Sequence, residues 1–243
     1  MTTVVPAQAE VDTPPWTTED DPAVDTDLAD DLDPVLVVSA HPDDESFGLG
    51  AVIAALTERG DTVNVLCFTR GEASTLGVDG DDLVSVRAAE LAAAGAALGV
   101  ERVEMLDYPD GALSEVDLDE LAGHVGRVAE VVGARSLLVF DHGGVTGHPD
   151  HQRATDAALA CQATAALPVL AWTLPAEVAD SLNAALGTGF VGRAADEIDV
   201  MVTVDRTRQE AACGEHRSQS HGNAALWRRL ELLGPVEHLR RLR

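Results

Sequence analysis

Residues Leu36–Gly50 read LVVSAHPDDESFGLG, and this stretch decides the fold. Its apolar run ends abruptly in one histidine, one proline and three consecutive acids, His41 to Glu45. Val35–Ser39 therefore predicts a buried strand, and the pattern from Gly48 to Arg59 predicts the helix after it. A strand followed directly by a helix is the unit of a parallel sheet, so we expect the charged turn at the carboxyl edge of that sheet.

The alternation of short apolar runs with longer amphipathic runs continues along the chain. Further strands are expected at Val63–Phe68, Val103–Leu106, Ser136–Phe140, Val169–Leu174 and, as the last one, Ile198–Val204. Helices are expected at Leu83–Leu98, Leu118–Val132, His151–Ala166 and from Thr207 to near Leu233, with a break near Ser220–Asn223. Continuously apolar strands that alternate with helices indicate a parallel sheet covered on both sides. The predicted fold class is α/β, a Rossmann-like, doubly wound, mostly parallel sheet with helices on both faces.

Composition divides the 243 residues into a tail and one domain. Residues 1–33 hold ten acidic residues, no basic residue and four prolines, so they cannot bury enough apolar area to offset the entropy of ordering. We expect a mostly disordered acidic tail, with a docking arm around Trp16 as the alternative. Residues 34–243 contain no Pro/Gly/Ser-rich linker, which predicts a single domain.

The net charge is −26, and all 16 basic residues are arginines. A field of this sign repels phosphates and anionic lipids, so neither nucleic acid nor a membrane is an expected partner. The three cysteines have no short spacing, which predicts reduced thiols in a cytoplasmic protein. No apolar run is long enough to span a bilayer, and no signal peptide pattern is present. A homo-oligomer is compatible with the sequence, which does not specify one.

Histidines and acids concentrate where the predicted strands end. HPDDE (41–45) follows the first strand, and GHPDH (147–151) follows the strand that ends at Phe140. The first turn lacks GxGxxG and the chain lacks lysine, which excludes a dinucleotide fingerprint and a P-loop. Imidazole and carboxylate groups favour a divalent ion such as Zn²⁺, which in catalytic sites takes three protein ligands and leaves one position for water. One such cluster could be only a helix N-cap, but two at one sheet edge favour a metal site.

Five short motifs resemble those of a known family. AHPDDE (40–45) and GHPDH (147–151) look like the signatures of the LmbE/PIG-L family of zinc-dependent N-acetylglucosaminyl deacetylases. TRGEAS (69–74), RAAE (87–90) and HRSQ (216–219) are similar to that family's GE, RxxE and late-helix segments. The resemblance covers about residues 35–219. It implies hydrolysis of an N-acetyl (amide) group by metal-activated water, on a small N-acylated sugar conjugate.

The resemblance also implies roles for eight residues. His41, Asp44 and His151 would hold the metal, Zn²⁺ or alternatively Fe²⁺ or another divalent ion. Asp43 would be the general base, and His148 the general acid or oxyanion stabiliser, positioned by Asp150. Arg87 and Asp110 would contact the substrate.

Other polar residues have simpler interpretations. Glu45 is expected as an acid in the first turn of a helix, and His216, His221 and His238 as structural or exposed histidines. Residues 73–82 and 176–196 are expected as loops that set specificity. Two alternative functions stay open: a same-fold amidase acting on a thiol conjugate or a secondary-metabolite amide, and a metal-containing binding module without turnover. Intact Asp43 and His148 argue against the binding module, because a pure binder needs neither.

Overall fold

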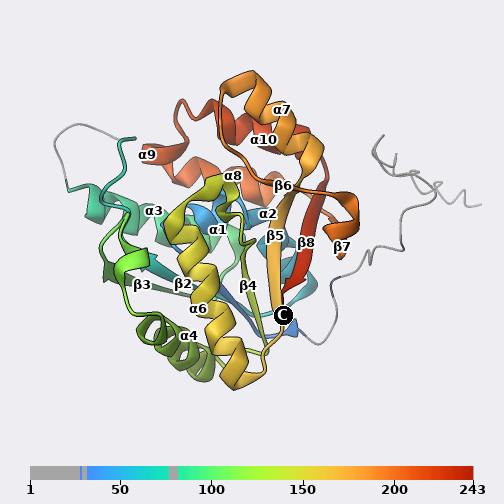
Figure 1. The fold of residues 1–243 in the computed structure, drawn as a ribbon. Coiled ribbons are helices and arrows are strands. Elements are labelled where there is room, and N and C mark those ends of the chain that lie inside the picture. Colours follow the sequence, from blue (N-terminus) through green and yellow to red (C-terminus); the bar gives the residue numbers. More distant parts are fainter. Residues whose placement is uncertain (1–27, 29–31, 77–81, 243) are drawn as a thin grey trace, which may run out of the picture.

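An eight-stranded sheet forms the centre of the molecule, which we describe from a computed structural model for residues 28, 32–76 and 82–242 (Figure 1). The hydrogen-bonded order is β3-β2-β1-β4-β5-β8-β7, and the short β6 pairs with the end of β5. The strands are β1 (Val35–Ser39), β2 (Val63–Thr69), β3 (Arg102–Tyr108), β4 (Ser136–Phe140), β5 (Val169–Pro175), β6 (Gly192–Arg193), β7 (Val200–Thr203) and β8 (Val236–Leu242). β1 to β5 are parallel, which confirms the predicted doubly wound α/β fold.

Helices cover both faces because successive side chains of a strand point to opposite sides. In β1, Leu36 and Val38 belong to the core beneath α4 (Leu118–Val132) and α6 (Pro149–Ala165), two helices that share one face (Figure 1). Val35 and Val37 belong to the opposite core, with side chains of the remaining long helices. These are α2 (Gly50–Arg59), α3 (Leu83–Leu98), α7 (Ala176–Leu186), α8 (Thr207–Glu215) and α10 (Ala224–Leu233).

The structure corrects the prediction in the C-terminal third of the chain. Residues 176–196, expected as a loop, begin with α7, whose buried stripe is only Val178, Ala179 and Leu182. The predicted last strand is followed by β8, which lies antiparallel between β5 and β7. This strand was not predicted, because the charged side chains of its sequence, VEHLRRL, interrupt the apolar pattern. Its Glu237 is nevertheless buried, since it accepts the indole N–H of Trp172 at 2.6 Å.

The segment just before β1 is attached to the core. Leu28 and Leu32 are buried in the same apolar cluster as Val35, and Ser136 Oγ donates to the Leu32 carbonyl at 2.7 Å. Residues 1–27 and 29–31 of the predicted tail, including the docking arm considered around Trp16, lie outside the described residues. Within the described part of the chain, no helix has the length and apolarity needed to cross a membrane.

The strand order creates a crevice between the turns that follow β1 and β4. From β1 the chain proceeds outward through β2 and β3, whereas β4 starts the other half of the sheet and pairs directly with β1. Connections that leave two adjacent parallel strands in opposite directions separate at the carboxyl edge, where ligands bind in such folds. The short α1 (Asp44–Phe47) follows β1 here, and α5 (Gly144–Gly147) and then α6 follow β4.

His238 gives β8 a measurable pH signature. Its side chain is almost fully buried, and burial together with the nearby Arg206 lowers its pKa from 6.5 to about 4. The unfolded chain takes up this proton near pH 6.5 and the folded chain only near pH 4, so acidification through that window should remove roughly 3 kcal/mol of stability. His238→Leu should flatten this part of the pH dependence in urea unfolding, and the exposed His221→Gln should not. Equal pH slopes for His238→Leu and the wild type would contradict this role.

Candidate functional site

A cavity of about 590 Å³ opens at the carboxyl ends of β1 and β4. Seven of the eight predicted site residues line it: His41, Asp43, Asp44, Arg87, Asp110, His148 and His151. The eighth, Asp150, is fully buried and contacts His41. Tertiary structure thus brings together side chains that come from four separate segments of the chain.

Three donor atoms converge between the two turns. His41 Nδ1 lies 3.1 Å from His151 Nε2, which lies 3.0 Å from Asp44 Oδ1. The other oxygen of Asp44, Oδ2, is 3.8 Å from His41 Nδ1. Two ligands of one tetrahedral zinc ion are about 3.3 Å apart, given Zn–N bonds of about 2.0 Å. Two imidazoles and one carboxylate at this spacing are able to hold a divalent ion.

In His41 and His151, one ring nitrogen is hydrogen-bonded to the protein and the other is free to bind a metal. His41 Nε2 lies 3.1 Å from Asp110 Oδ1 and 3.3 Å from Asp150 Oδ2, so in the neutral ring the proton belongs on Nε2 and Nδ1 keeps its lone pair. His151 Nδ1 lies 3.0 Å from the Gly144 carbonyl, so its proton belongs on Nδ1 and its Nε2 is free. Outer partners of this kind orient metal-binding histidines and raise their basicity. Asp110, predicted as a substrate contact, therefore contacts a predicted metal ligand instead.

The site strongly favours positive charge. Burial would lower the pKa of His41, but hydrogen bonds to Asp110 and Asp150 and the charges of Asp44 and Asp43 raise it to about 10. A place that stabilises a proton this strongly also stabilises a metal cation, because the same carboxylates attract both. Other triples of donors meet here too, namely His41 with His148 and His151, and His41 with Asp110 and Asp150.

The two adjacent aspartates point in different directions. Asp44 turns back onto the strand end, where its Oδ2 accepts the backbone N–H groups of Ala40 at 3.0 Å and His41 at 2.8 Å. Its pKa is lowered, because the charges and hydrogen bonds of His151 and His41 outweigh the opposing effect of burial. Asp43 has φ of 144°, a backbone conformation rare for residues other than glycine. Such strain is typical of functional sites and is held by the surrounding structure.

Asp43 faces Arg87 rather than the other acids. Its Oδ2 lies 3.0 Å from Arg87 Nη2, and burial raises its pKa to about 6 despite the opposing charge of that arginine. A carboxylate with this pKa is well suited to accept a proton near neutral pH. Arg87 also donates to the carbonyls of Gly71 and Pro42. A Cβ at Gly71 would lie 1.8 Å from Arg87 Nη1, which explains the glycine in the TRGEAS segment.

His148 is held differently from the expectation. The Asp150 carboxylate, predicted to position His148, instead accepts the N–H groups of Gly111 at 2.7 Å and Leu113 at 3.1 Å and contacts His41. It is the backbone N–H of Asp150 that donates to His148 Nδ1, at 3.2 Å. In the neutral ring the proton then belongs on Nε2. Burial and the neighbouring His151 and His41 lower the pKa of His148, which favours this neutral form.

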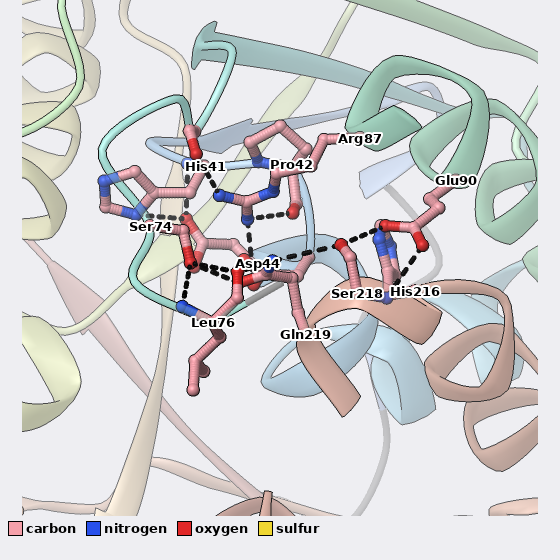
Figure 2. A network of polar contacts seen from close by, with 12 residues as sticks. His41, Pro42, Asp44, Ser74, Leu76, Arg87, Glu90, His216, Ser218 and Gln219 are labelled. Carbon is pink, nitrogen blue, oxygen red and sulfur yellow. Dashed lines mark hydrogen bonds and ion pairs between the residues drawn. The ribbon is translucent and has the colours of Figure 1, made fainter. Parts of the chain in front are cut away.

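The HRSQ segment is bonded to α3 and to the loop that contains Ser74 (Figure 2). Ser218 donates its N–H and Oγ to Glu90 of α3, at 2.8 and 2.6 Å. Gln219 accepts from Ser74 Oγ at 2.7 Å and donates to the Leu76 carbonyl at 3.0 Å. These bonds give the RxxE and TRGEAS motifs a shared structural role.

Glu45 and His216 form a buried pair next to the turn after β1, which the sequence did not predict. Both are fully buried, and His216 Nε2 lies 2.6 Å from Glu45 Oε1. Glu45 Oε2 accepts the N–H of Asp43 at 3.0 Å and so supports the strained residue. Burial lowers and Glu45 raises the pKa of His216, with the net shift upward. The signal in the sequence was the HRSQ motif itself, but the partner of His216 is 171 residues away.

Comparison with known proteins identifies relatives. The family model described as PIG-L, GlcNAc-PI de-N-acetylase, matches residues 36–162. A relative from Nakamurella multipartita, a 1D-myo-inositol 2-acetamido-2-deoxy-alpha-D-glucopyranoside deacetylase, is 32% identical over an alignment of length 231 that covers 76% of this chain and 79% of the relative. A deacetylase of the same name from Kineococcus radiotolerans is 34% identical over an alignment of length 154 that covers 51% of this chain. This chain spans only 43% of that second relative's length.

Solved structures share the fold at lower identity. The A40926 pseudoaglycone deacetylase has a TM-score of 0.65 at 19% identity, with 87% of this chain and 97% of that chain covered. The 4-carboxy-2-hydroxymuconate hydratase GalB from Pseudomonas putida KT2440 also has a TM-score of 0.65, at 21% identity, with 86% and 95% covered. A deacetylase and a hydratase thus share this fold, so the fold alone does not decide the reaction. The sequence match decides the family: this chain belongs to the PIG-L family.

Proposed function

We propose that this protein is a metal-dependent hydrolase that removes the N-acetyl group of an N-acetylglucosamine-type sugar conjugate. The observation that carries the proposal is the convergence of His41 Nδ1, Asp44 Oδ1 and His151 Nε2 beside the Asp43 carboxylate. Relatives named as deacetylases of a 2-acetamido sugar support the acetamide as the bond that is cleaved. Zinc is the metal we propose, with Fe²⁺ as the alternative for the same donor set.

Five polar residues of the cavity have a part in the proposed reaction. A divalent ion held by His41, Asp44 and His151 would supply a Lewis acid that lowers the pKa of a water molecule to about 7. Asp43 accepts a proton from the attacking water. His148 carries its proton on Nε2 and donates it in a hydrogen bond to the carbonyl oxygen as negative charge develops there. Asp43 then passes its proton to the leaving nitrogen, and the products are acetate and the free amino sugar.

The same groups would cleave the amide of a thiol conjugate or of a secondary metabolite. The metal ligands and Asp43 act on the amide alone, so the walls of the cavity select the rest of the substrate. Acetate release from a panel of N-acetylated sugars and other N-acyl amides separates these substrate classes. Cleavage only of amides that carry no sugar would retain the reaction type and reject the sugar substrate.

Metal removal tests the reaction type. Dialysis against a chelator should lower acetate release at least about 100-fold, because the Lewis acid contributes several kcal/mol to transition-state stabilisation. One equivalent of Zn²⁺ or Fe²⁺ should restore activity, and the comparison identifies the preferred metal. Unchanged activity in protein shown by elemental analysis to be metal-free would overturn the proposal.

A further inference from the structure

Arg229, on α10, is a buried cation that lines the candidate active-site cavity. It is 7% exposed, and the same cavity contains Asp43 and His151. Arg87 is the other buried arginine of the described residues, and its guanidinium lies 3.0 Å from the Asp43 carboxylate. Arg229 differs, because no carboxylate of the described residues lies within ion-pairing distance of it.

The guanidinium of Arg229 is held in place without a counter-charge. Its Nη2 donates to the Phe47 carbonyl at 2.8 Å, and its Nε has no hydrogen-bond partner in the described structure. The group lies 5.3 Å from the ring centroid of Trp172 and 5.9 Å from that of Phe190. Aromatic faces attract the cation and fix its plane, but they do not use its N–H donors.

The acids that influence Arg229 are engaged elsewhere. Glu237 accepts the indole N–H of Trp172 at 2.6 Å and pairs with Arg206 at 2.5 Å. Asp44 is bonded to His151 and to the end of β1. Burial lowers the pKa of Arg229, an effect that Glu237 opposes, but an arginine stays charged in proteins. Buried charges are normally paired, so an unpaired cation in a cavity wall is suited to pair with an anionic ligand.

A row of rings connects Arg229 with the metal ligands. Phe140 lies 4.9 Å from His151 and 5.5 Å from Trp172, and Arg229 lies over Trp172. We propose that Arg229 binds an anionic substituent, a phosphate or a carboxylate, on the sugar or aglycone of the substrate whose acetamide faces Asp43. This inference rests on the proposed deacetylation. It also gives an anionic substrate one attractive contact inside a protein whose net charge of −26 repels anions.

Kinetics with matched substrates tests the proposal in the wild-type protein. N-acetylglucosamine 6-phosphate and 1-phosphate, N-acetylmuramic acid and neutral N-acetylglucosamine present the same acetamide with a phosphate, a carboxylate or no charge. We expect kcat/KM for at least one anionic sugar to exceed that for the neutral sugar by about 10- to 100-fold, the usual effect of hydrogen bonds to a charged group. Comparison of the three anionic sugars shows which anion, and which position of it on the sugar, Arg229 binds. Equal kcat/KM for all four sugars would overturn the proposal.

Two substitutions on α10 assign the preference to Arg229. Arg229→Met keeps a long side chain but removes the charge, and should abolish the preference while changing kcat/KM for the neutral sugar less than about threefold. Arg229→Lys should keep part of the preference, since lysine offers the charge without the planar fork of donors. The control is Arg228→Met, because Arg228 is exposed and pairs with Glu231. Equal losses on neutral and anionic sugars in Arg229→Met would mean a structural role.

A binding measurement separates this proposal from the reaction itself. In the metal-loaded Asp43→Asn protein, titration calorimetry with the same sugars reports affinity without turnover. Tighter binding of an anionic sugar, lost on adding Arg229→Met, supports the inference even if no acetate is released by the wild-type protein. Indistinguishable affinities would reject the anion site and leave the deacetylase proposal intact.

Discussion

Asp43→Asn is expected to lower kcat for acetate release by about 10³- to 10⁴-fold while the protein keeps its metal, the upper range for loss of a general base. Asparagine has nearly the same shape and tolerates positive φ better than most residues, so it suits the backbone at φ 144°. It cannot accept a proton from water. Asp43 is bonded to Arg87 and not to the converging donors, so the metal ligands remain intact.

The measurement combines kcat with elemental analysis of the purified variant. Asp107→Asn is the matched control, since Asp107 is a highly exposed aspartate near the same sheet edge. That control should retain wild-type kcat and metal content. Near-normal turnover in Asp43→Asn would show that another group takes the proton, and the assignment of the base would be wrong.

Asp44→Asn is expected to lose the metal, and with it the activity. Asp44 Oδ1 is one of the three converging donors, and Oδ2 accepts two backbone N–H groups at the end of β1. An amide can still accept from the backbone with its oxygen, but it then presents an NH₂ group to the metal and brings no negative charge. We expect metal affinity to fall at least about 100-fold, more than the 10- to 100-fold effect typical of outer partners.

Competition with a metal-binding dye measures this affinity, and added metal should rescue turnover only at high concentration. The two neighbouring variants therefore differ in kind: Asp43→Asn keeps the metal without turnover, and Asp44→Asn loses both at low metal concentration. Wild-type affinity in Asp44→Asn would show that the ligand set is instead His41, His148 and His151, whose donor atoms also meet.

The sequence patterns correctly predicted the helices and strands whose burial is explained by their own residues. β1, β2, β4 and β5 are buried along their whole length, and α3 and α4 begin and end at the predicted residues. β8 and α7 were not predicted, because their polarity is explained only by contacts with other elements. Glu237 of β8 is buried through Trp172 and Arg206, which lie 65 and 31 residues away in the chain.

The candidate site shows the same division. The sequence by itself determined six of the eight candidate residues, because HPDDE and GHPDH place imidazoles and carboxylates at the ends of two strands. The resemblance to the family added Arg87 and Asp110. Only the tertiary structure decided which ring nitrogens of the two histidines His41 and His151 are available to bind a metal. Asp110 and Asp150 occupy His41 Nε2, and the Gly144 carbonyl occupies His151 Nδ1. Which nitrogen of a neutral histidine keeps a free lone pair depends on partners that meet only after folding. The contacts of Glu45 with His216 and of Arg229 with Trp172 also form only after folding, because the partners are far apart in the sequence.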